Sequence, residues 1–261
     1  MGEHSKMKNL ILTTLLFTSM MIISITNIHA AIQQESIVGI WLLEDGQGED
    51  IKDASVNGND GKIFNAKWTD GKIGKGLEFD GTSRVVIPAS DTTEDYLDGF
   101  TYLLWVKPTT KTPGNHTRLI ERGWHNPTIQ IGPNDFYGSI VQNKNQDSSN
   151  VRGGKWKLDE WSFVALTHDG NVLKLYVDGE PVADKTLGKA DTTTDAELRF
   201  GAYSRAGWDF TGVLDEIGVF NVAISDNDIN SIMNNGLEET LAVTAAGKLA
   251  VTWGHLKKTQ F

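Results

Sequence analysis

Short runs of apolar and β-branched residues recur along most of the chain, separated by turns rich in glycine and aspartate. Several runs alternate apolar and polar positions, a period of two that favours half-buried β-strands over helices. Many short strands with few helical periods predict an all-β fold, namely a two-sheet antiparallel sandwich rather than parallel βαβ units. The runs expected to form strands are Ser36–Leu43, Gly76–Phe79, Arg84–Ile87, Phe100–Val106, Arg118–Glu121, Thr128–Ile131, Ser139–Gln142, Trp161–His168, Val172–Val177, Glu180–Lys185, Leu198–Ala202 and Gly212–Phe220.

Aspartate–glycine pairs mark the tightest turns between these runs. Asp80–Gly81 divides Leu77–Ile87 into two strand-like halves, which predicts a β-hairpin. Asp169–Gly170 and Asp178–Gly179 follow the same scheme later in the chain. The three strands around them are therefore expected to form a meander of consecutive hairpins.

The run Val213–Asn221 carries two adjacent carboxylates, Asp215 and Glu216. Most of its apolar residues share one parity, but Leu214 breaks the alternation. We expect a half-buried strand with its acids near one end, paired with the segment around Asp80–Gly81. Because neighbouring side chains on a strand alternate, the two carboxylates are expected to point to opposite faces.

One short helix is predicted near the C-terminus. Ser225 is a good N-cap, Asp226 and Asp228 place negative charge in the first turn, and Gly236 is a typical residue to end the helix. The repeated Leu-Ala-Val-Thr sequence that follows predicts a terminal hairpin and basic tail over residues 241–261.

Residues 1–30 have the order of a secretory signal peptide. Lys6 and Lys8 precede the apolar run Leu10–Ile25, and small residues then precede Ala31. The alternative is an N-terminal membrane anchor, since the run is not far short of the ~20 apolar residues that span a bilayer. We expect export and cleavage, because Thr and Ser interrupt the run and no positive charge follows it.

The rest of the chain is acidic and has no cysteine. The formal net charge is −10, and removing the +1 contributed by residues 1–30 leaves −11. This charge argues against nucleic acid and anionic membrane surfaces as partners, and it favours cations. Without disulfides, residues 31–240 are expected to be one domain held by an apolar core, in which Trp105 and Trp161 are buried.

Seven segments, taken in order, make the chain similar to bacterial laminin G-like domains of the concanavalin A-like group. The resemblance implies a two-sheet jelly roll, an extracellular location, and binding or structural roles more often than catalysis. Some of these relatives carry a small disulfide near the end of the domain, which cannot form here. The segments are Trp41–Gly46, Asn57–Gly61, Gly71–Gly81, Thr101–Pro108, Trp161–Thr167, Leu175–Gly179 and Leu214–Asn221.

The resemblance also implies a possible calcium site at the rim of the sandwich. Carried over residue by residue, its ligands would be Glu44, Asp80 or the Gly81 carbonyl, and Asp215. Ca²⁺ takes 6–8 oxygen ligands and readily mixes carboxylates with backbone carbonyls. The alternative is that Asp80 only stabilises its turn and that Asp215 hydrogen-bonds the end of its strand.

Catalytic motifs are not found. A glycosidase needs two carboxylates about 5–9.5 Å apart across a cleft, and the adjacent Asp215 and Glu216 do not provide that arrangement. The sequence also has no Gly-x-Ser-x-Gly nucleophile motif and no His-Glu-x-x-His zinc helix. We therefore expect a protein that is not an enzyme.

Two loops combine aromatic and basic residues and are the candidate ligand site. One contains Arg122 and Trp124, and the other contains Tyr203, Arg205 and Trp208. Sugar rings stack on aromatic planes while polar side chains bind their hydroxyls, so the loops could form a shallow glycan site. The alternative is that the two tryptophans fold back as lids over the ends of the sandwich.

The leading hypothesis is a secreted or cell-envelope binding module that recognises an extracellular glycan or a protein surface. It does not bind nucleic acid, and it meets the membrane only through the signal segment before cleavage. The alternatives are a carbohydrate-active enzyme of the concanavalin A-like lyase or glucanase group, and a structural component of the envelope. The sequence does not identify the ligand.

Overall fold

The computed structural model of the protein describes residues 32–93, 98–110, 116–123, 127–142, 147–191, 196–204 and 207–242. Residues 32–261 form one compact unit, separate from residues 1–31. The predicted signal segment and residues 243–261 lie outside the described residues, so their expected structures stay predictions. No helix in the described ranges combines the length and the apolar character needed to cross a membrane.

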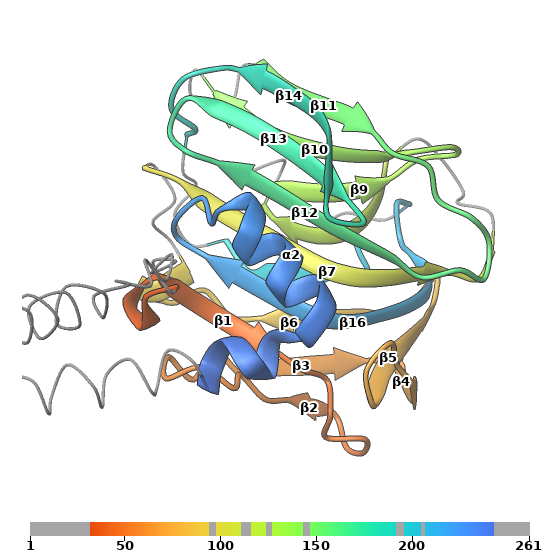
Figure 1. The fold of residues 1–261 in the computed structure, drawn as a ribbon. Helices are drawn as coiled ribbons and strands as arrows, with labels where there is room; N and C mark the ends of the chain where they lie inside the picture. Colours follow the sequence, from red (N-terminus) through yellow and green to blue (C-terminus); the bar gives the residue numbers. More distant parts are fainter. Residues whose placement is uncertain are drawn as a thin grey trace, which may run out of the picture. The chain divides into compact units, whose positions relative to one another are not determined.

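The described strands form two antiparallel sheets, as expected for a jelly-roll sandwich, and Figure 1 shows them as two layers. Sheet A has the strand order β14-β13-β12-β7-β16-β5-β4, and β1 also pairs with β16. One side of β16 pairs with β7, while the other side pairs first with β5 and then with β1. The strands of sheet A are β1 (Ile37–Trp41), β4 (Lys67–Asp70), β5 (Lys75–Asp80), β7 (Phe100–Pro108), β12 (Ser162–His168), β13 (Val172–Val177), β14 (Glu180–Thr186) and β16 (Thr211–Phe220).

Sheet B has the strand order β11-β10-β9-β8-β15-β6-β3-β2. Two short 3₁₀ helices, η1 (Gln34–Ser36) and η2 (Asp91–Thr93), precede β1 and follow β6. The strands of sheet B are β2 (Asp50–Ile51), β3 (Gly61–Phe64), β6 (Arg84–Ile87), β8 (Thr117–Arg122), β9 (Thr128–Ile131), β10 (Phe136–Gln142), β11 (Asp147–Gly153) and β15 (Leu198–Phe200).

The main apolar core lies between the two sheets and receives side chains from both. Trp41 of sheet A meets Phe200 of sheet B edge to face, with ring centroids 5.1 Å apart. The indole nitrogen of Trp41 donates to the Asn59 carbonyl at 2.9 Å, so this buried ring has its polar atom paired. Burial of large apolar surface provides the stability that disulfides cannot supply in this chain.

Helix α2 (Asp226–Asn235) covers part of the outer face of sheet A (Figure 1), where a second apolar cluster forms. The predicted boundaries are confirmed: Ser225 and Asp228 form a reciprocal capping box, and Gly236 ends the helix. Ile229 and Ile232 are its buried residues. Residues 237–242 are also helical, so the expected terminal hairpin does not begin at 241.

The second apolar cluster changes the interpretation of two tryptophans. Trp105 is 7% exposed and thus buried as expected, but it packs edge to face on Phe163 outside the main core. Trp161 is only half-buried, so the expectation that it lies in the core is wrong. Both positions are close to sheet A's outer surface, where Lys72 and Lys107 lie over the two rings.

The hairpin predicted around Asp80–Gly81 does not form. A turn is present, but β5 belongs to sheet A and β6 belongs to sheet B, so the chain crosses the sandwich there. Each strand finds other partners, because β5 pairs with β16 and β6 pairs with β15 and β3. By contrast, the predicted meander is confirmed, since β12, β13 and β14 pair consecutively across the Asp169–Gly170 and Asp178–Gly179 turns.

Four strands were not predicted: β2, β3, β4 and β11. Three of them, β2, β4 and β11, lie at sheet edges. Edge strands are exposed to water along one side, so their sequences carry a weaker apolar pattern. The burial of β4 illustrates this, because no residue from Lys67 to Asp70 is fully buried.

Candidate functional site

The side of sheet B that faces away from the core is polar across β8, β9, β10 and β11. Ile129 and Ile131 belong to the main core, so the intervening Gln130 points to the other side of the sheet. In register with Gln130 are Arg118 on β8 and Tyr137 on β10. The residues of this polar face are Arg118, Glu121, Thr128, Gln130, Tyr137, Ser139 and Arg152.

A buried ion pair lies within the polar face. Arg118 Nε donates to Glu121 Oε2 at 2.9 Å, and both side chains are fully buried. Burial raises the pKa of Glu121 and lowers the pKa of Arg118, while the opposite charge of the partner counteracts both shifts. The second oxygen of Glu121 accepts from the Ser204 backbone amide at 3.3 Å. The pair is therefore tied to the loop that follows β15.

Aromatic rings of that loop lie over the ion pair. The Arg118 guanidinium is 5.0 Å from the Tyr203 ring and 4.8 Å from the Trp208 ring, which are 4.7 Å from each other. The His116 ring meets Trp208 at 5.5 Å. His116 is exposed and Trp208 is half-buried, so these two rings are the accessible part of the cluster. A stacking ligand can reach them without displacing the ion pair.

Hydrogen bonds join His116 to the strands beneath it. Its Nδ1 and the side-chain oxygen of Gln130 are 3.1 Å apart, and Gln130 Nε2 donates to Ser139 Oγ at 3.1 Å. At the β11 edge, Arg152 lies over the Tyr137 ring at 4.2 Å and pairs with Asp135 at 2.5 Å. The polar face is thus a connected network rather than a set of isolated side chains.

Two hydroxyl groups of the polar face have no hydrogen-bond partner among the described residues. They are Thr128 Oγ1 and the Tyr137 hydroxyl, and both atoms are buried. Buried polar atoms are nearly always paired, and leaving one unpaired costs about 1–3 kcal/mol. Each hydroxyl is therefore a local cost to stability within the polar face.

The structure brings together only part of the predicted ligand site. The Tyr203 and Trp208 rings contact each other in a tilted arrangement, whereas Arg122 is fully buried at the end of β8. Trp124 and Arg205 lie outside the described residues. Four further residues lie with this pair and were not predicted from the sequence, namely His116, Arg118, Glu121 and Gln130.

The proposed calcium ligands do not form one set. Asp215 Oδ2 accepts from the Lys72 and Ile73 amides at 2.8 and 2.9 Å, and Glu44 Oε1 accepts from the Lys75 amide at 2.9 Å. Glu44 and Asp215 therefore hold the loop between β4 and β5. Gly74 in this loop has a φ of +52°, and an added Cβ would collide with the Glu44 carboxylate.

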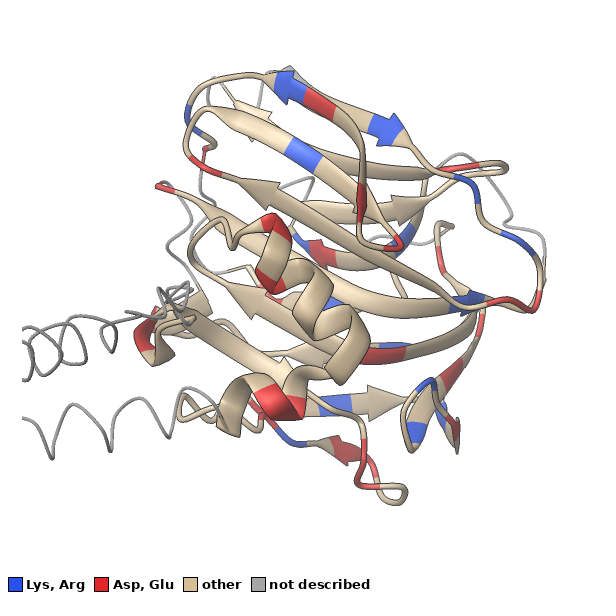
Figure 2. Cartoon of the chain, in the orientation of Figure 1, with Lys and Arg blue, Asp and Glu red and all other residues tan. Residues whose placement is uncertain are grey.

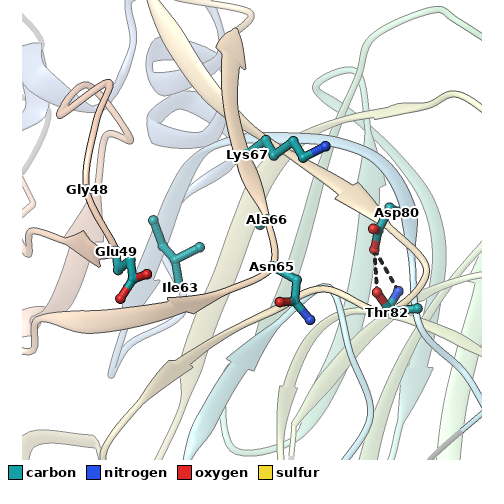
Figure 3. A pocket seen from close by; sticks show the side chains of 8 residues that line it. All are labelled: Gly48, Glu49, Ile63, Asn65, Ala66, Lys67, Asp80 and Thr82. Carbon is teal, nitrogen blue, oxygen red and sulfur yellow. Dashed lines mark hydrogen bonds between the residues drawn. The ribbon is translucent and has the colours of Figure 1, made fainter.

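Asp80 lies elsewhere, beside a pocket of about 480 Å³ that Glu49, Asn65 and Lys67 also line (Figure 3). Its Oδ1 accepts from the Thr82 amide, the Thr82 hydroxyl and the Ser83 hydroxyl at 2.7–2.9 Å. These hydrogen bonds lower the pKa of Asp80 to about 2. The carboxylate thus stabilises its own turn, which is the alternative that the sequence allowed.

A shared calcium ion does not fit this geometry. Asp80 is opposite Thr211 on β16, four positions before Asp215, which corresponds to about 13 Å along a strand. No group of three or more acidic or histidine side chains in the described ranges could hold a metal ion. Glu44, Asp80, Gly81 and Asp215 therefore do not form the ligand set of one ion, and calcium binding by the chain stays a prediction.

A β-bulge also corrects the expectation that Asp215 and Glu216 point to opposite faces. The β16 register shifts between Asp215 and Gly218, and Glu216 has a φ of +50°. Glu216 Oε2 accepts from the Leu237 amide at 2.6 Å, on the outer side of sheet A where Asp215 also lies. Burial raises the pKa of each carboxyl to about 7.

Comparison with known proteins supports the architecture. No curated protein matches the chain. Among solved structures, the binding domain of Paraclostridial Mosquitocidal Protein 1 is similar with a TM-score of 0.64 and 14% identity, over 77% of this chain and 52% of that one. This chain thus spans about half the length of that domain. A binding domain of botulinum neurotoxin DC, solved with SialylT, has a TM-score of 0.60 and 13% identity over 77% and 52%.

A third solved structure is similar over nearly its full length. Domain 4 of AbnA, a GH43 extracellular arabinanase from Geobacillus stearothermophilus, was solved with arabinotriose; it has a TM-score of 0.57 and 20% identity over 76% of this chain and 98% of that one. These identities are low, so the likenesses establish the fold alone. A family model described as the concanavalin A-like lectin/glucanases superfamily, Laminin_G_3, matches residues 79–230, which is more than half of the sequence. The chain therefore belongs to the concanavalin A-like lectin/glucanase superfamily.

Proposed function

We propose that the protein is a non-catalytic binding module that recognises a glycan at the polar face of sheet B. The observation that carries this proposal is the contact of the Arg118 guanidinium with the Tyr203 and Trp208 rings, with His116 at the exposed edge of this cluster. Aromatic rings offer planes for the C–H faces of a sugar, and the surrounding polar groups match its hydroxyls. The buried ion pair and hydrogen-bond network fix these rings in place before a ligand arrives.

The solved relatives support a binding role without assigning a ligand. The AbnA domain was solved with arabinotriose, and botulinum neurotoxin DC binding domains were solved with SialylT and with rat synaptotagmin II. Both glycans and proteins therefore bind to domains of this architecture. We favour a glycan for this chain because its accessible residues are two aromatic rings, His116 and Trp208, in contact edge to face above a hydrogen-bonded polar network.

The described carboxylates support a module without catalysis. Asp215 and Glu216 have the most strongly raised carboxyl pKa values, about 7 each, which is a feature of many general acids. Both are buried and both accept backbone amide hydrogen bonds, so neither is available to a substrate. Within the polar face, the Glu121 carboxylate is fully buried against Arg118.

Export remains part of the proposal. The basic, apolar and small-residue order of residues 1–30 supports a cleaved signal peptide. N-terminal sequencing of protein recovered from the medium or the cell envelope should begin near Ala31. Recovery of the uncut chain in membranes would instead identify a membrane anchor.

Binding can be tested with an oligosaccharide array and two tryptophan variants. Trp208→Ala removes the accessible ring beside Arg118, whereas Trp161→Ala removes a half-buried ring beside Lys107, at 5.1 Å, on the other sheet. We expect the wild type and Trp161→Ala to bind the same oligosaccharides, and Trp208→Ala to lose at least about fivefold in affinity, since a stacking ring contributes about 1–3 kcal/mol. Equal affinities of the two variants would show that the glycan site lies away from Trp208. Binding of a protein but of no oligosaccharide would replace the glycan with a protein ligand.

A further inference from the structure

The arginine side chains that the structure describes around the polar face are already paired. Arg118 pairs with Glu121 at 2.9 Å, and Arg152 pairs with Asp135 at 2.5 Å. On β15, Arg199 is in register with Glu121 and pairs with Glu197 at 2.6 Å. A guanidinium group held by a carboxylate has less attraction to offer to a second anion.

Among the described side chains around the face, carboxylates slightly outnumber guanidinium groups. Asp209 accepts from the Tyr203 amide at 3.4 Å and has no salt bridge to a cation among the described residues. Around the face, the described side chains thus provide three guanidinium groups and four carboxylates. Figure 2 shows the same mixing over the wider fold, with acidic and basic segments interspersed rather than gathered on one strand.

The accessible groups of the face are also of the kind that neutral sugars use. The His116 and Trp208 rings supply stacking planes, and Ser204 beside them is exposed. An acidic sugar would lose the hydration of its carboxylate on binding, and no unpaired described cation is there to compensate. The acidic chain as a whole, at −11 without residues 1–30, adds a repulsion that slows the approach of polyanions.

We infer that the polar face selects uncharged oligosaccharides and rejects those that carry carboxylate or sulfate groups. This inference rests on the proposed function, because it names the ligand class for the same site. Arg152 is the most exposed of the three guanidinium side chains, at 47%, so it is the one that an acidic sugar could reach most easily. Its pairing with Asp135 is therefore one cause of the selection against acidic sugars. Asp135 thus acts as a specificity-determining residue.

Matched ligands test the selection directly. The probes are uronic acid-containing oligosaccharides and the same oligosaccharides after reduction of their carboxyl groups, arrayed beside neutral oligosaccharides. We expect the wild type to bind reduced or neutral members at least about tenfold more tightly than acidic ones, because like charges at an interface are strongly unfavourable. Binding of the neutral members should change little between low and high salt.

Two charge variants test whether Asp135 causes the selection against acidic oligosaccharides. Asp135→Asn leaves Arg152 without its carboxylate and should raise the affinity for the acidic members at least about fivefold, in a salt-dependent way. Asp70→Asn is the control, because it makes the same change in net charge by releasing Lys75 at the β4–β5 turn, away from the face. It should leave both affinities unchanged.

The outcomes separate this inference from the proposed function. Tighter binding of acidic members by the wild type, lost in Trp208→Ala, would overturn the selection and leave the glycan site in place. An equal gain in affinity for acidic oligosaccharides in Asp135→Asn and Asp70→Asn would overturn the role of Asp135 in specificity. Binding to no member, or binding that does not depend on Trp208, would contradict the proposed function itself.

Discussion

Asp215 and Glu216 lie next to each other on β16, and each accepts backbone hydrogen bonds from a different surface segment. Asp215 holds the β4–β5 loop through the Lys72 and Ile73 amides, and Glu216 holds the start of the 237–242 helix through the Leu237 amide. Adjacent acids in a strand are visible in the sequence. The hydrogen bonds that these acids make cannot be seen in the sequence, because a bulge and two distant segments determine which amides they contact.

The raised pKa values predict how stability depends on pH. Burial raises the pKa of Asp215 from 3.8 and of Glu216 from 4.5 to about 7, with Glu44 and Glu238 adding repulsion at Glu216. Between about pH 4 and 7 the folded state therefore binds more protons than the unfolded state, and stability falls as pH rises through that window. We expect a lower melting temperature at pH 8 than at pH 6 from these two groups.

A conservative variant isolates this effect. Glu216→Gln keeps an oxygen for the Leu237 amide and cannot ionise, so its melting temperature should change less between pH 6 and 8 than that of the wild type. Burial lowers the pKa of His168, so this residue makes stability rise with pH below about pH 6.5. Its contribution is the same in both proteins and cancels when their pH profiles are compared. Identical pH profiles for the two proteins would contradict the account.

The two tryptophans of sheet A predict different losses of stability. Trp105 is 7% exposed and packs on Phe163, so Trp105→Ala should lower the free energy of unfolding by about 3–5 kcal/mol. Trp161 is half-buried, so Trp161→Ala should lower the free energy of unfolding by roughly half as much or less. Chemical denaturation of both variants measures the difference, and a larger loss at Trp161 would show that its burial is underestimated.

At the scale of elements, features with a local cause were predictable from the sequence. Asp169–Gly170 and Asp178–Gly179 made the right turns because neighbouring strands pair across them. The Asp80–Gly81 turn carries the same local signal, yet its flanking strands belong to different sheets. The break in alternation at Leu214 was a sign of the bulge, because Leu214, Ile217 and Val219 all reach the core once Glu216 is inserted.

The cap of α2 gives a prediction at this scale. Ser225 Oγ accepts from the Asp228 amide at 3.2 Å, and the Asp228 carboxylate accepts from the Ser225 amide at 3.2 Å. Ser225→Ala should destabilise the protein by about 1 kcal/mol in chemical denaturation. Ser231→Ala, at an exposed position inside the same helix, should be neutral or slightly stabilising because alanine has the higher helix propensity. A neutral Ser225→Ala would mean that the cap does not limit the stability of the fold.

At the scale of the whole molecule, the sequence predicted the sandwich better than it predicted the site. Apolar alternation and ordered turns are spread over the chain, so errors at β2 or β4 leave the architecture unchanged. The site depends instead on a contact between Arg118 and the Tyr203–Trp208 pair, which are far apart in sequence. Only the strand register shows that Arg118, Gln130 and Tyr137 form one row.

The most direct test of the central claim is a crystal structure of the chain with a bound neutral oligosaccharide found on the array. We predict a sugar ring in van der Waals contact, about 4 Å, with Trp208 and His116, above the Arg118–Glu121 pair. A sugar bound in the pocket beside Asp80, with the His116 and Trp208 rings free, would contradict the account.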